Sequence, residues 1–93
     1  MYKAIIAQYA VRLLKKFVPR IKNLIIAEFG NIAKNPYSAA QLTGKNSFLR
    51  SWHVYIEGVP YRILFQIDES AKTVIIRLFG KRDDIYKIID KLF

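Results

Sequence analysis

The chain has 93 residues, of which 16 are Lys or Arg and seven are Asp or Glu, giving a formal net charge of +9. This length predicts one domain spanning 1–93, and the absence of cysteine excludes a disulfide framework and thiolate metal ligands, as expected of a cytoplasmic protein. No apolar run reaches the roughly 18 residues that cross a bilayer, so no membrane partner is expected, and the charge favours a polyanionic partner such as RNA, DNA or an acidic protein over mere solubility.

The N-terminal third predicts a strand followed by two helices. Residues 2–7 mix apolar and β-branched side chains, which is typical of a strand. From Gln8 the period changes, because Val11, Leu14 and Val18 share one helical face while the basic side chains lie opposite. Pro19 ends or redirects this helix.

The second helix is expected over residues 20–34. Its apolar stripe has spacings of three and four and consists of Ile21, Leu24, Ile25, Phe29 and Ile32. The segment "KNPYS" ends the helix, since the residue before a proline leaves the helical region. Residues 38–47 are predicted to form a loop.

Three strands are expected next, at 51–57, 61–68 and 73–80. The first two alternate apolar and polar residues, whereas "TVIIRLFG" is nearly all apolar, as in a strand that is covered on both faces. Their close spacing predicts an antiparallel meander. Residues 82–93 show helical spacing, with two acids in the first turn that suit the helix dipole. The order β-α-α-β-β-β-α predicts an α+β fold, with the helical hairpin packed on an antiparallel sheet.

Alternation places a set of polar residues on the face of the sheet that is turned away from the hairpin. His53, Tyr55 and Arg62 lie there, and Arg82 and Tyr86, four residues apart, share one side of a helical turn. Such a cationic surface suits cleavage of an RNA phosphodiester: arginines stabilise phosphate charge, an imidazole moves protons and a tyrosine stacks on a base.

Each of these residues also has a structural interpretation. His53 is a weak signal alone, Arg62 can instead pair with Asp68 or Glu57, and Tyr86 can be a core aromatic. The adjacent acids at residues 83 and 84 resemble helix-capping residues more than a metal site, which needs more oxygen ligands. No metal and no cofactor are therefore expected.

The segments "PYRILFQID" and "GKRDDIY", in their order and spacing within a small basic chain, resemble the RelE/ParE superfamily of type II toxin–antitoxin toxins. The resemblance covers nearly the whole chain and implies the same β-α-α-β-β-β fold. It also implies a choice between two activities. RelE-like toxins cut mRNA in the ribosomal A site by 2′-hydroxyl attack without metal, whereas ParE-like toxins poison DNA gyrase; a non-catalytic nucleic-acid-binding relative is the third alternative.

The resemblance carries roles to single residues and favours the mRNA endonuclease. Arg62 matches the phosphate-binding arginine, Arg82 the arginine that assists the leaving group, and Tyr86 the tyrosine that orients the substrate. His53 is the candidate general base if the 51–57 strand keeps its register; a slip by one residue places Trp52 and Val54 there instead.

Four further residues are expected to bind RNA, and a second partner is implied. The RNA-binding candidates are Lys45, Arg50, Tyr55 and Lys81. The resemblance also implies a cognate antitoxin, often acidic, that wraps the toxin and displaces or covers its C-terminal helix. The net charge suits both RNA and such an antitoxin, so charge does not separate them.

Overall fold

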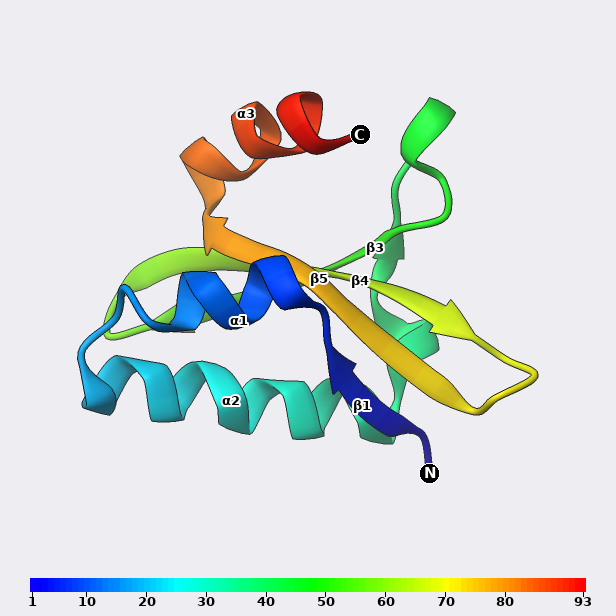
Figure 1. The fold of residues 1–93 in the computed structure, drawn as a ribbon, viewed down its shortest axis with the longest axis horizontal. Helices are drawn as coiled ribbons and strands as arrows, with labels where there is room; N and C mark the ends of the chain where they lie inside the picture. The colour runs from blue at the N-terminus through cyan, green and yellow to red at the C-terminus, as the bar shows by residue number, and fades with distance from the viewer.

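The computed structural model describes residues 1–93 and contains a five-stranded sheet with three α-helices (Figure 1). The elements follow in the order β1 (Lys3–Ile6), α1 (Gln8–Leu14), α2 (Pro19–Lys34), the 3₁₀ helix η1 (Pro36–Ser38), β2 (Ala40–Gln41), the 3₁₀ helix η2 (Gly44–Asn46), β3 (Arg50–Ile56), β4 (Val59–Asp68), β5 (Thr73–Lys81) and α3 (Arg82–Leu92). The α+β class and the predicted order of the long elements are confirmed.

The sheet is mixed, with the strand order β1-β5-β4-β3-β2. Strands β3, β4 and β5 form the predicted antiparallel meander. β1 joins the sheet parallel to β5, which departs from a purely antiparallel sheet. The sequence pattern identifies β1 as a strand but does not name its neighbour, because pairing between strands so distant in the chain is set by packing. The two-residue strand β2 lies in the segment predicted as a loop.

The sheet is covered on both faces, with α1 and α2 on one face and α3 on the other (Figure 1). The larger core lies beneath the helical hairpin and includes Ile25, Phe29, Phe65 and Phe79. A smaller core lies under α3 and consists of Leu49, Leu64, Leu78, Ile85 and Ile89. β5 contributes to both cores, which confirms the prediction from its nearly continuous apolar run.

The helical hairpin turns earlier than the sequence pattern suggests. α1 ends at Leu14, and residues 15–17 continue only as single turns with backbone bonds to residues three positions back. Pro19 occupies the first turn of α2, where its missing N–H costs nothing. Of the predicted stripe of α1, Leu14 is buried but Val11 and Val18 are exposed, while Ala10 supplies the remaining buried contact. None of the helices has the length and apolar character that a bilayer crossing requires.

Candidate functional site

The candidate site begins at a tight turn between β3 and β4. Glu57 and Gly58 form a two-residue connection with φ values of 51° and 80°. Positive φ at both central residues is the backbone of a type I′ hairpin turn, whose twist matches that of the strands. This turn sets the register in which His53 lies directly opposite Arg62. Both side chains therefore lie on the face turned away from α1 and α2, and Trp52 and Val54 pack on the hairpin side.

Arg62 meets the C-terminal helix through Tyr86. The Arg62 guanidinium donates a hydrogen bond to the Tyr86 hydroxyl, and its Cζ lies 5.6 Å from the centroid of the Tyr86 ring. On the neighbouring strand Arg62 is opposite Gly80, which has no side chain to separate it from α3. Ile85 and Ile89 of α3 are buried against the sheet and hold the helix in this position.

A small cavity of about 130 Å³ is lined by three of the four predicted catalytic residues, His53, Arg62 and Arg82, but not by Tyr86. It is lined by His53, Val54, Tyr55, Pro60, Tyr61, Arg62 and Arg82. No carboxylate lines it, although the Arg82 Nε lies 3.4 Å from the Asp83 carboxylate beside it. That pair is exposed and long, so it offsets little of the positive charge at the cavity. Two guanidiniums therefore face a space where a phosphate fits their charge.

The imidazole of His53 suits a proton acceptor. Partial burial lowers the pKa of His53 below its usual 6.5, and the positive charge of Arg62 lowers it further. Both causes disfavour the imidazolium form. The side chain is consequently neutral near pH 7 and has a nitrogen lone pair free to take a proton.

The structural interpretations of Arg62 and Tyr86 do not fit the observed contacts. Asp68 accepts hydrogen bonds from Ser70 and from the backbone N–H of Ala71. Glu57 pairs with Arg20 at 2.9 Å, so neither acid reaches Arg62. Tyr86 is 46% exposed and is not a core aromatic.

Residues 2–86 match the family model described as the ParE toxin of type II toxin–antitoxin systems. The chain belongs to this toxin family. It is thereby a type II toxin of the RelE/ParE superfamily, as its sequence motifs predict. No curated protein sequence matches it.

Solved structures support the same assignment of the fold. The toxin–antitoxin complex RelBE2 from Mycobacterium tuberculosis contains a chain 28% identical to this toxin, with a TM-score of 0.75, covering 89% of this chain and 93% of that one. The E. coli RelBE complex shares the fold with a TM-score of 0.67 at 12% identity, and the match covers 87% of this chain and 96% of that one. A mutant of E. coli RelE in the free state shares it with a TM-score of 0.68 at 12% identity, covering 99% of this chain and 98% of that one.

The four RNA-binding candidates of the toxin are not gathered in one place. Tyr55 is 72% exposed and lines the cavity, and Lys81 is exposed at the end of β5 directly before Arg82. Lys45 is exposed in η2, outside the cavity. Arg50 lies on the hairpin face instead, where it donates to the Ala39 carbonyl at 2.8 Å and stacks over Tyr37 at 5.0 Å.

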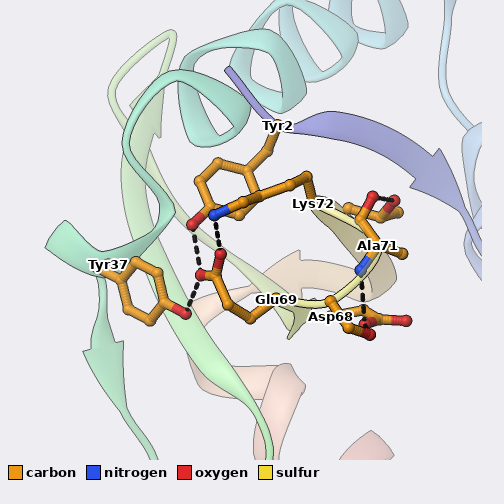
Figure 2. Close-up of polar contacts among 8 residues, drawn as sticks. Tyr2, Tyr37, Asp68, Glu69, Ala71 and Lys72 are labelled. Carbon is orange, nitrogen blue, oxygen red and sulfur yellow. Dashed lines mark hydrogen bonds and ion pairs between the residues drawn. The ribbon is translucent and has the colours of Figure 1, made fainter.

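Two features of the toxin were missed by sequence reasoning. One is a cavity of about 360 Å³ between the loop after β2 and α3, which Tyr86 borders together with Gln41, Thr43, Asn46 and Asp90. The signal for it is the concentration of short polar residues in the segment predicted as a loop. The second is a polar network around Glu69 at the far end of the sheet (Figure 2).

In this network Glu69 accepts hydrogen bonds from the hydroxyls of Tyr2 at 2.5 Å and Tyr37 at 2.6 Å, and it pairs with Lys72. These donors, from Lys72 first, lower the pKa of Glu69 to about 2. The same carboxylate raises the pKa of Tyr37 to about 12. The network ties the N-terminus and η1 to the β4–β5 turn (Figure 2).

Proposed function

We propose that this toxin is an endoribonuclease that cleaves mRNA in the ribosomal A site by 2′-hydroxyl attack. The observation that carries the proposal is that Arg62, Arg82 and His53 line one cationic cavity without lining carboxylates, and that Tyr86 is bonded to Arg62 beside it. Of these, Arg62, Arg82 and Tyr86 match the RNase branch of the superfamily, whereas His53 is the candidate base in a strand that departs from the family pattern. A gyrase poison has no need of them.

In the proposed reaction His53 takes the proton of the 2′-hydroxyl. The 2′-oxygen then forms a bond to phosphorus while the bond from phosphorus to the 5′-oxygen breaks. The products are a 2′,3′-cyclic phosphate and a 5′-hydroxyl, whose proton comes from the imidazolium or from water. Arg62 and Arg82 stabilise the charge that grows on the phosphate oxygens, and Arg82 also stabilises the leaving oxygen.

Tyr86 has two proposed roles. Its hydroxyl fixes the orientation of the Arg62 guanidinium, and its exposed ring offers a stacking surface for a base. Tyr55, which lines the cavity, offers a second ring. Stacking holds single-stranded RNA regardless of its sequence, so it positions the scissile phosphate without selecting it.

We infer that a cognate antitoxin is the second partner. Relatives have been crystallised with theirs, as in the RelBE2 complex of M. tuberculosis and the E. coli RelBE complex. An antitoxin with an acidic segment complements the net charge of +9.

Inhibition of DNA gyrase is the second candidate function. The matching family model, which describes ParE toxins, favours it. This alternative assigns no chemical role to Arg82, so substitution of Arg82 separates the two activities.

The test is induced expression in a bacterial host, comparing the parent with Arg82→Ala and with Lys91→Ala. The second variant is a matched control, because Lys91 lies in the last turn of the same helix and its loss changes the charge equally. Primer extension on a reporter mRNA is expected to show new cleavage sites with the parent and with Lys91→Ala, and none with Arg82→Ala. Growth arrest with intact mRNA would reject the nuclease and favour gyrase, and absence of arrest would favour a non-catalytic relative.

A further inference from the structure

The first 27 residues of the toxin contain six cations and no acid. The cations are Lys3, Arg12, Lys15, Lys16, Arg20 and Lys22, and the first acidic residue is Glu28. Only Arg20 forms an ion pair, with Glu57. Arg12, Lys15 and Lys16 are all exposed and have no side-chain hydrogen bond or ion pair. We call these three residues the basic turn.

The placement of these cations costs folding stability. Lys15 and Lys16 lie three and four positions after Arg12, in the turns that follow α1, where like charges that lie close together repel. Arg20 and Lys22 lie in the first two turns of α2, near the positive end of its dipole, and no acid offsets them in its first turn. The C-terminus of α1 compensates for part of this repulsion, since Arg12 lies in its last turn. A cluster that is unfavourable for folding points to a role in binding.

The basic turn lies on the hairpin side of the sheet, at the same end of the molecule as the candidate cavity (Figure 1). Phe17, the residue after it, packs on Tyr61 with ring centroids 6.2 Å apart and on Phe79 at 5.7 Å. Tyr61 lines the cavity and is the strand partner of Lys81. The Arg20–Glu57 ion pair joins the start of α2 to the β3–β4 turn. Figure 1 shows the α1–α2 connection and the β3–β4 turn at the same end of the molecule.

We propose that the basic turn is a second phosphate-binding surface, which holds the backbone of the RNA whose scissile phosphate occupies the cavity. Lys81, which is exposed and is the strand partner of the cavity residue Tyr61, adds a further cation next to Arg82. The inference rests on the proposed function, because it assigns a flanking stretch of the same substrate. It adds affinity that depends on charge and does not depend on sequence.

The surface suits a nucleic-acid backbone better than an acidic protein. None of the four cavities of the structure is lined by a residue of the basic turn, so it offers no pocket for an apolar anchor. Protein interfaces take most of their energy from such buried anchors. Flexible cationic side chains on an open surface suffice for phosphates, and lysines bind them as point charges.

The test measures RNA binding separately from cleavage. The triple variant Arg12→Gln/Lys15→Gln/Lys16→Gln is compared with the matched control Lys3→Gln/Lys34→Gln/Lys91→Gln, which removes the same three charges from other elements. The probe is a 2′-O-methyl RNA of about 12 nucleotides, within the size range of single-strand sites. This RNA lacks the attacking hydroxyl and stays intact. Affinity is measured by fluorescence anisotropy at several salt concentrations.

The logarithm of the association constant decreases with the logarithm of the salt concentration, with a slope of about −0.7 for each phosphate contact in a single strand. The triple variant removes three such contacts, so its slope is expected to be shallower than that of the parent by about 2. The control is expected to change the slope by less than half as much. Equal changes in the two variants, or no change in the first, would overturn the proposal.

Cleavage of unmodified mRNA by the parent tests the proposed function independently. If the parent cleaves but the two variants bind alike, the nuclease stands and the second surface is rejected. If the parent does not cleave mRNA, this inference is rejected together with the proposed function, because no scissile phosphate then occupies the cavity.

Discussion

The two ends of β4 carry polar clusters of opposite character. After its last residue, Glu69 is surrounded by the donors of Tyr2, Tyr37 and Lys72 (Figure 2). Near its first residue, Arg62 has no acid partner and only the Tyr86 hydroxyl to bond. The two ends of one strand thus carry a carboxylate that three donors of the protein bind and a guanidinium that no carboxylate of the protein pairs with.

The difference separates a structural cluster from a binding site. A carboxylate that accepts three hydrogen bonds within the folded protein has no reason to bind anything else, and its contacts link distant segments of the chain. Arg62 has no carboxylate partner and Arg82 has only the long, exposed contact with Asp83, so these cations gain little for folding but keep their charge available for a substrate. Substitutions at the two ends are therefore expected to divide between stability and activity.

The largest effect is expected from Arg62→Gln. Loss of the guanidinium removes a donor to the charge on phosphate, so single-turnover cleavage of mRNA is expected to decrease roughly 100- to 1,000-fold. The melting temperature is expected to change little, because the only side-chain partner of Arg62 is the exposed Tyr86. Unchanged cleavage in a folded Arg62→Gln protein would mean that this end of β4 is not the active site.

The His53→Gln variant is expected to cleave mRNA about 100-fold more slowly in single-turnover reactions. This is the lower end of the range for loss of a general base. Since the pKa of His53 lies below its usual 6.5, the parent is expected to lose activity as the pH decreases below that value. Protonation removes the lone pair that accepts the proton. The pH–rate profile of the variant is expected to lack this acid limb, and an identical limb in both proteins would assign the base elsewhere.

Tyr86→Phe is expected to reduce cleavage about tenfold, because it removes one hydrogen bond to a charged group and retains the ring. Tyr86→Ala, which also removes the stacking surface, is expected to reduce cleavage further. Comparison of the two variants by single-turnover kinetics separates orientation of Arg62 from stacking. If phenylalanine costs as much as alanine, the ring itself contributes nothing.

The smallest effect on activity is expected from Glu69→Gln at the other end of β4. Stability at pH 7 is expected to decrease, because the three donors of the carboxylate lose its charge. The pKa of Glu69 is lowered from 4.5 to about 2, so its contribution is complete above about 4.5 and is lost as the pH decreases toward 2. Denaturant unfolding is expected to distinguish the variant from the parent at pH 7 but not near pH 2, while cleavage at pH 7 stays unchanged.

The polar face of the site was predictable from alternation alone. His53 and Arg62 are both out of phase with the apolar residues of their strands, which places them on the face without the hairpin. The same argument places Arg50 with Trp52 on the hairpin face, and the structure finds it there. Its assignment to RNA binding stays a prediction, for a side chain that lies away from His53 and Arg62.

Other features depended on contacts between distant segments. The Glu69 network joins residues 2, 37 and 69, and no local pattern connects them. The cavity beside Tyr86 needs both the loop after β2 and α3.

By itself the sequence determined the α+β class, the long elements and the polar face of β3 and β4, because periodicity is a local property of the chain. Only the tertiary structure decided that β1 pairs parallel with β5, that α3 docks on the outer face, and that Tyr86 thereby reaches Arg62. These outcomes depend on how separate apolar surfaces pack together. They place the tyrosine of a helix in hydrogen-bonding contact with the arginine of a strand, beside the cavity that the arginine lines.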